Sequence, residues 1–203
     1  MSRTRQLIPA AMFLTLLLAA TAQSVAPAGV DPALLAKAGA GDAAAQVALG
    51  EQYARAAAAE HNRTQMAADY QQELAWYQKA ASQNNIAGEM HLAALYRDGA
   101  GNTVPRDMQQ AAAWYRKAAD QGDATAQGIL GVLYSIGQGV PRDDVEAYFW
   151  LDLAASVDGP NQEKYAANRQ AIGERITADQ LSDAQDRVAA WKAAHPRSGS
   201  SHH

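Results

Sequence analysis

Apolar and polar residues recur at helical spacing along most of the chain. Three segments, 41–53, 84–96 and 122–134, each carry a leucine and a tyrosine four positions apart, which places both side chains on one face of a helix. The pairs are Leu49 and Tyr53, Leu92 and Tyr96, and Leu130 and Tyr134. An N-cap residue precedes each segment, namely Asp42, Asn85 and Asp123. The pattern therefore predicts three helices, each with one buried face.

A second block repeats between these segments. AWYQKAASQNN (75–85) and AWYRKAADQGD (113–123) are identical at seven of eleven positions and lie 38 residues apart. FWLDLAASVDG (149–159) follows 36 residues later as a third copy. Each unit thus reads as two antiparallel helices, and stacked units of this length predict an all-α fold, an α/α solenoid.

The connections within the units carry turn and stop signals. Gly99 and Gly137 stand where the first helix of a pair should end, and Pro105 and Pro141 prevent its continuation. Two Asp-x-x-Gln/Glu patterns, at 107–110 and 143–146, resemble capping boxes for the second helix. Small residues beside the leucines should let the second helix approach closely; these are Gly50, Ala93 and Gly131.

The ends of the array depart from the pattern. The first copy lacks the glycine-proline loop, so its helices should be longer, with a turn near His61 and Asn62. Residues 23–40 read as an N-terminal segment with a half-helix cap, and 41–158 as three repeats. Capping helices are expected within 159–195, over about 161–175 and about 178–194, the second opened by Thr177-x-x-Gln180. Residues 196–203 have the composition of a disordered tail and include histidines that resemble a cloning remnant.

The first 22 residues read as a cleavable signal peptide. Arg3 and Arg5 precede an uncharged apolar run from Leu7 to Ala20, and Ala20-Thr21-Ala22 is a small-x-small cleavage site. The run is too short to span a bilayer as a helix, which takes about 20 residues. The alternative is an apolar first helix of the fold. The signal peptide predicts a periplasmic or secreted protein with no stable membrane insertion after cleavage.

Composition narrows the function classes. The formal net charge is −4, which gives no support for nucleic-acid binding. Cysteine is absent, and this excludes a lipobox, disulfides, thiol catalysis and cysteine-ligated metals. Hydrophobic residues make up 48% of the chain, enough for a packed core.

The repeat blocks, taken in order, resemble the Sel-one-like repeat (SLR) family, a tetratricopeptide-type α-solenoid. The tryptophan, paired alanines, Gly-Asp-x-x-Ala-Gln, Leu-Gly-x-x-Tyr and Gly-x-Gly-Val-Pro all occur in residues 41 to about 158. The resemblance implies a concave surface that binds another protein or peptide. It also implies that residues 165–191 form a C-terminal helical cap. Exported bacterial members act as scaffolds, regulators of envelope signalling, assembly factors or immunity proteins.

Motifs for catalysis and cofactors are missing from the sequence. It contains no HExxH, GxSxG, SxxK or Walker pattern, and the Gly-x-Gly pairs at 99–101 and 137–139 are followed by Val-Pro rather than a third glycine. Cysteine-rich members of the family have been linked to β-lactam binding or hydrolysis, but this chain lacks their cysteines. We therefore expect no enzyme activity, cofactor or metal site.

The candidate partner-binding surface is a strip on the first helix of each unit, on positions outside the leucine-tyrosine face. The residues of the strip are Val47, Glu51, Arg55, Met90, Ala94, Arg97, Asp98, Gly128, Val132 and Ser135. The alternative for the apolar members Val47, Met90 and Val132 is core between repeats. Three functions remain open: a scaffold or regulator of an envelope complex, an immunity or inhibitor protein that occludes a secreted toxin, and an enzyme or small-molecule binder such as a hydrolase.

Overall fold

The computed structural model describes residues 30–196, and this part of the chain folds into nine α-helices with no strand. The predicted signal peptide (1–22), residues 23–29 and most of the predicted tail (197–203) lie outside the described residues. The helices are α1 (Pro32–Gly39), α2 (Ala43–Ala59), α3 (Arg63–Ser82), α4 (Ile86–Asp98), α5 (Met108–Asp120), α6 (Ala124–Ile136), α7 (Asp144–Ala155), α8 (Gln162–Gly173) and α9 (Ala178–Ala194). The expected all-α repeat fold is confirmed.

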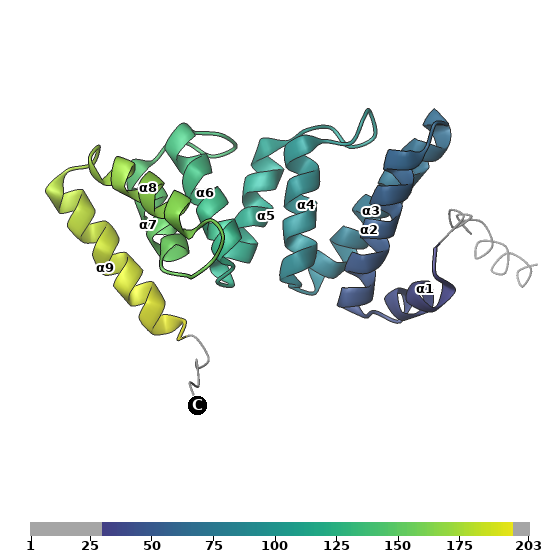
Figure 1. Ribbon diagram of the computed structural model, residues 1–203, viewed down its shortest axis with the longest axis horizontal. Helices are drawn as coiled ribbons and strands as arrows, with labels where there is room; N and C mark the ends of the chain where they lie inside the picture. The colour runs from purple at the N-terminus through teal and green to yellow at the C-terminus, as the bar shows by residue number, and fades with distance from the viewer. Residues whose placement is uncertain (1–29, 197–203) are drawn as a thin grey trace, which may run out of the picture.

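The helices stack side by side along the long axis of the molecule, from α1 at one end to α9 at the other (Figure 1). Three hairpins form the body: α2 with α3, α4 with α5, and α6 with α7. The turn of the first hairpin falls at residues 60–62, as its longer helices predict. Within the described range, no helix has both the length and the apolar character that crossing a membrane requires.

Small residues set the distance within each hairpin. A Cβ on Gly50 would lie 2.6 Å from a ring carbon of Tyr77, and one on Gly131 would lie 2.7 Å from Cγ of Leu151. Ala93 is the equivalent residue in the second hairpin and shares a core cluster with Tyr115. The expected close approach of the second helix at these positions is confirmed.

Side chains cap the helices largely as the sequence indicates. Asp42, Asn85 and Asp123 accept a backbone N–H of the first turn of α2, α4 and α6. Gly99 and Gly137 have φ of 73° and 69°, the left-handed region that favours glycine.

The capping boxes predicted at 107–110 and 143–146 form only in part, because the backbone N–H groups of Asp107 and Asp143 donate to the carbonyls of Tyr96 and Tyr134 instead. Asp107 and Asp143 do cap α5 and α7 through their carboxylates. The Glu146 side chain, however, accepts from Trp150 Nε1 and pairs with Arg187 of α9 rather than returning to the backbone of Asp143. The full reciprocal box forms at Thr177 and Gln180, where the sequence predicts it.

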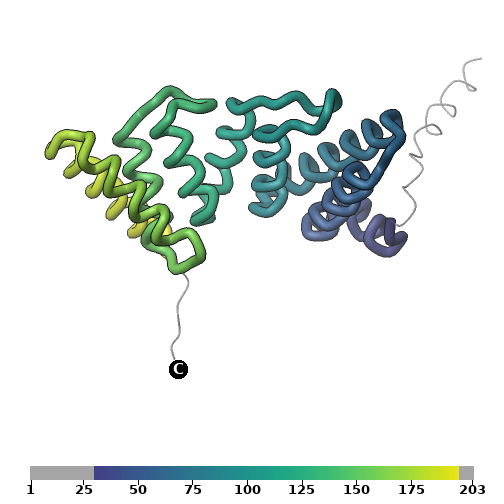
Figure 2. The backbone as a smooth tube through the Cα atoms, turned by 45° about the horizontal axis from the view of Figure 1, so that its top comes forward, coloured from purple at the N-terminus to yellow at the C-terminus, as the bar shows by residue number. Residues whose placement is uncertain are grey.

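Two helices close the C-terminal end (Figure 2). α8 contacts α6, as α4 contacts α2, so α8 takes the place of the first helix of a fourth unit. α9 packs on α7, where Val188 lies in a cluster with Phe149 and Trp150. Asp152 of α7 holds both helices, because it pairs with Arg169 of α8 at 2.6 Å and Lys192 of α9 at 3.4 Å.

Candidate functional site

Four residues of the predicted strip meet at one pocket. The pocket has a volume of about 440 Å³ and lies between α2, α3 and α4; we call it the α2–α4 pocket. Its strip residues are Glu51, Arg55, Ala94 and Asp98. Tyr70, Glu73, Tyr77 and His91 line it as well, together with Ala54, Leu95, Gly99 and Ala100. The first helices of two units therefore form its sides, and the second helix of the first unit forms its floor.

Charged groups at the edge of the pocket are linked to one another. Glu51 lies 3.9 Å from the guanidinium of Arg55 and 3.3 Å from Nε2 of His91. The His91 ring stacks on Tyr77, with centroids 4.7 Å apart and planes 5° from parallel. The Arg55 side chain is 68% exposed, so it is accessible to a partner without any rearrangement of the fold.

Glu73 on the floor is the most unusual residue of the pocket. Its side chain is only 7% exposed, and no described residue forms a hydrogen bond or an ion pair with it. Burial raises its pKa from 4.5 to about 7, since the charged form loses its hydration. Burial likewise raises the pKa of the neighbouring Tyr77, and the charge of Glu73 adds to that shift. A buried carboxylate without a donor is costly, and it has unused capacity to accept hydrogen bonds from a ligand.

Sequence reasoning missed Glu73, although the repeat alignment contains the signal. Residues 75–85 and 113–123 align with an offset of 38, and this places Glu73 opposite Ala111. The offset of 36 to the third copy then gives Ala147. Both alanines are fully buried. The other two units carry a buried alanine at this position, so packing of the core does not explain the glutamate of the first unit.

Arg97 of the strip lies one unit further along and has partners within the chain. Its guanidinium forms two bonds with the Asp98 carboxylate, of 2.8 and 2.7 Å, and a third of 3.1 Å with the Tyr115 hydroxyl. The bonds with Arg97 lower the pKa of Asp98. Asp98 stays largely exposed at the edge of the α2–α4 pocket.

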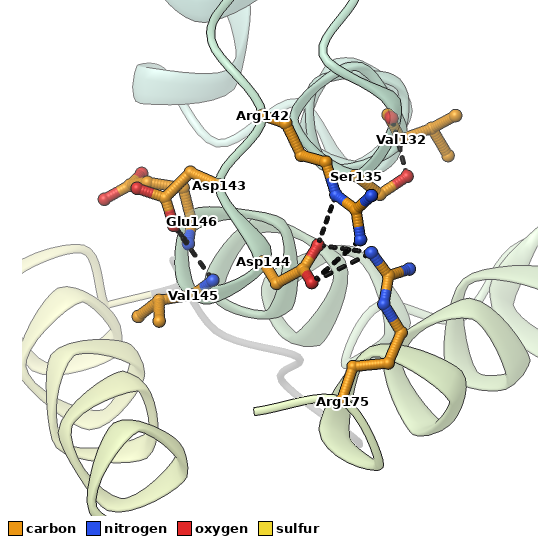
Figure 3. A network of polar contacts seen from close by, with 8 residues as sticks. All are labelled: Val132, Ser135, Arg142, Asp143, Asp144, Val145, Glu146 and Arg175. Carbon is orange, nitrogen blue, oxygen red and sulfur yellow. Dashed lines mark hydrogen bonds and ion pairs between the residues drawn. The ribbon is translucent and has the colours of Figure 1, made fainter. Parts of the chain in front are cut away.

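The strip residues of the third unit are separated from this pocket. Ser135 donates its hydroxyl to the carbonyl of Val132 at 2.8 Å, within α6. Asp144 lies beside them and bridges Arg142 and Arg175, at 3.3 and 2.6 Å, which ties α7 to the turn after α8 (Figure 3). Val132 is half-buried against the cluster of α7 and α8.

Two strip positions were placed wrongly as accessible. Val47 is 8% exposed and packs with Leu92 and Leu95 of α4, so the alternative of core between repeats is correct for it. Gly128 is buried under the ring of Tyr165 from α8. Met90, at the same repeat position, is half-buried between two clusters. This position faces the first helix of the next unit, which covers it.

A larger cavity of about 600 Å³ lies at the opposite ends of the helices, between α6, α7, α9 and the turn after α5. Amides and apolar groups form much of its wall, including Gln127, Leu153 and Trp191. Lys192 at its edge is paired with Asp152. Among the described residues, no group of three histidine or carboxylate side chains is placed to hold a metal ion.

Comparisons with known proteins agree with this architecture. The model of the Sel1 repeat matches residues 43–85, 86–123 and 124–157, which together make up more than half of the chain. No curated protein sequence matches the chain.

Two solved structures are similar to it. One is a protective antigen present in uropathogenic Escherichia coli strains, displaying an SLR fold, at 28% identity and a TM-score of 0.54 over 79% of this chain. The other is a Sel1 repeat protein from Oxalobacter formigenes, at 29% identity and a TM-score of 0.56 over 68% of this chain and 96% of that one. The match spans only 40% of the E. coli protein.

Proposed function

This chain belongs to the Sel1-repeat family, whose members generally mediate protein–protein interaction and are typically non-enzymatic; on that premise we propose that it is a non-enzymatic module that holds one partner protein over the α2–α4 pocket. The observation that carries the proposal is the pocket itself. It gathers four strip residues around Glu73, a buried carboxyl with no partner among the described residues. Exposed charges of both signs surround it, as is typical of the rim of a protein interface.

The proposal includes export. Residues 1–22 have the charge pattern, apolar run and cleavage site of a signal peptide, which supports a periplasmic or secreted location. In that compartment a repeat module without catalytic motifs would serve as a scaffold or regulator of an envelope complex. Fractionation of cells that make the full-length chain tests the location. We expect the shortened mature form outside the cytoplasm, and an uncleaved cytoplasmic chain would contradict export.

Affinity capture with a charge-reversed variant tests the binding role. Arg55→Glu is the better probe than a change at Arg97, because Arg97 is bonded to Tyr115 and Asp98 and its loss would disturb the fold. The matched control is Lys164→Glu, the same charge change at an exposed position of α8. We expect one dominant stoichiometric partner with the wild type and the control, and its loss with Arg55→Glu, because Arg55 is exposed at the rim and would there pair with an acidic group of the partner, apart from the group that enters the pocket. Equal capture by all three chains would contradict the assignment to this pocket.

A further inference from the structure

The three units carry different residues at two positions, which line the α2–α4 pocket in the first unit and its equivalents in the other two. Residues 41–53 align with residues 84–96 at an offset of 43, and residues 84–96 align with residues 122–134 at an offset of 38. Continued by one residue, this alignment makes Ala54 equivalent to Arg97 and Ser135. On the second helix, Glu73 aligns with Ala111 and Ala147. The first unit therefore has a small residue where the second has a guanidinium, and a carboxyl where the second has a methyl group.

In the second unit the chain fills the site with its own arginine. The Arg97 guanidinium lies 3.1 Å from the Tyr115 hydroxyl, and Tyr115 is the residue aligned with Tyr77. The third unit is filled differently. There Tyr165 covers Gly128, and the cluster of Arg142, Asp144 and Arg175 lies beside Ser135 (Figure 3).

In the first unit the same place is open. Ala54 lines the α2–α4 pocket in place of an arginine, and Glu73 and Tyr77 line it from α3. Three carboxylates and one guanidinium line the pocket. Tyr70 lines the pocket as well and supplies an aromatic ring on which a planar cation can stack, whereas the ring of Tyr77 already stacks on His91.

We propose that the α2–α4 pocket takes an arginine side chain of the partner, whose guanidinium donates to the Glu73 carboxylate and the Tyr77 hydroxyl as Arg97 donates to Tyr115. The inference rests on the proposed function and specifies the recognition chemistry. A guanidinium is favoured over an ammonium because its planar fork matches a carboxylate and can stack on tyrosine. Arg97 is evidence within the chain that a guanidinium suits this position of a unit.

Arginine binding should depend on pH. Glu73 must be ionised to accept a guanidinium well, and its pKa without a ligand is about 7. The groups that face it are Glu51 and Arg55 of α2, Tyr70 and Tyr77 of α3, and His91 and Asp98 of α4. The ionised fraction of Glu73 rises about 10-fold between pH 6 and pH 8, so the affinity should rise by a similar factor and a proton should be released on binding. Glu73→Gln removes the carboxyl and so tests whether Glu73 carries the pH dependence.

Nuclear magnetic resonance titration of the full chain with short blocked peptides tests the proposal. The probe is acetyl-Ala-Arg-Ala-amide, and the control is the same peptide with citrulline, a neutral isostere of arginine. We expect saturable shifts of the Tyr77 and His91 ring signals with the arginine peptide, and affinity at least about 10-fold weaker for citrulline, as loss of a charged hydrogen-bond pair implies. Glu73→Gln and Ala54→Arg should each abolish the arginine effect, the second because it supplies the guanidinium from within the chain.

The variants keep the test decisive. Glu73→Ala introduces the residue that the other units carry at this position, so it provides a folded chain without the carboxyl if Glu73→Gln does not fold. Equal affinity for arginine and citrulline, or undiminished binding by the Glu73 variants, would overturn the inference. If the arginine peptide fails while Arg55→Glu still loses the partner, the arginine inference is wrong and the binding role stands. If the arginine peptide binds while Arg55→Glu leaves capture of the partner unaffected, the pocket does bind arginine, and the placement of the partner over the pocket is wrong.

Discussion

Glu73 shows, at the scale of one residue, how a repeat protein departs from packing at the place where it binds. The equivalent Ala111 and Ala147 are fully buried, and a methyl group there costs nothing in hydration. A carboxyl at that position loses its hydration and gains no partner among the described residues. Such a residue lowers stability unless a ligand supplies the missing hydrogen-bond donor.

Replacing Glu73 by glutamine should change the pH dependence of stability. Because the pKa of Glu73 is raised from 4.5 to about 7 on folding, the folded chain binds more protons than the unfolded chain between these values, and stability falls as pH rises through that window. Relative to the wild type, Glu73→Gln should therefore gain on the order of 3 kcal/mol between pH 4.5 and pH 8. Urea unfolding at both pH values measures the gain, with exposed Glu163→Gln as the control that should gain nothing.

Glu89 should respond to the same exchange for a different reason. It aligns with Gln46 and Gln127, whose amides donate to the carbonyls of Ala38 and Ala119, eight residues earlier. Glu89 is fully buried, one of its oxygens has no partner, and burial raises its pKa. Glu89→Gln restores the donor toward the carbonyl of Ala81.

We expect Glu89→Gln to stabilise the chain by about 1–2 kcal/mol at pH 8. The gain should shrink at acidic pH, where the protonated carboxyl can itself donate, so that the sign of the pH effect follows from the raised pKa. Thermal unfolding at two pH values checks this. A destabilised Glu89→Gln chain at pH 8 would contradict the equivalence of the three positions.

At the scale of helices, the distance within each hairpin depends on one small residue. Gly131→Ala would place its Cβ 2.7 Å from Leu151, inside contact distance, so we expect a loss of about 1–3 kcal/mol. Gly39→Ala is the control, because a Cβ there meets nothing within 4 Å and the added methyl group should be neutral or stabilise by about 0.4–1 kcal/mol. Denaturant titration compares the two. Equal stability of both variants would show that the hairpins adjust freely.

The sequence predicts the elements of this fold well and the accessible surface less well. N-caps, glycine C-caps and the capping box at Thr177 are local signals, and each depends on residues within one turn. Accessibility depends on a neighbouring unit that a single helix does not reveal. Val47 was misplaced for that reason, because α4 covers it. Glu73 does not stand out in the sequence, because similarity between the units identifies the fold, whereas this site lies where one unit differs from the others.

At the scale of the whole molecule, one substitution in α7 should weaken the packing of both C-terminal helices, α8 and α9, against the repeats. Asp152 pairs with both Arg169 and Lys192, so it links α7 to α8 and α9. In a stack of units each contacts mainly its neighbours, and a weakened cap should leave distant units intact. Asp152→Asn should therefore increase hydrogen exchange in α8 and α9 and leave α2 and α3 unchanged. Asp186→Asn, at an exposed position of α9, is the control, and uniform exchange along the chain would argue against independent units.

The central claim is that a partner protein lies over the α2–α4 pocket. Photo-crosslinking tests it most directly, with a photoreactive amino acid at Ala94 in the pocket and, as the matched alanine position, at exposed Ala113 of α5. The account predicts one crosslinked partner from Ala94, none from Ala113, and loss of the Ala94 adduct when Ala54→Arg fills the pocket. Adducts from Ala113 alone, or an Ala94 adduct that Ala54→Arg leaves unchanged, would contradict it.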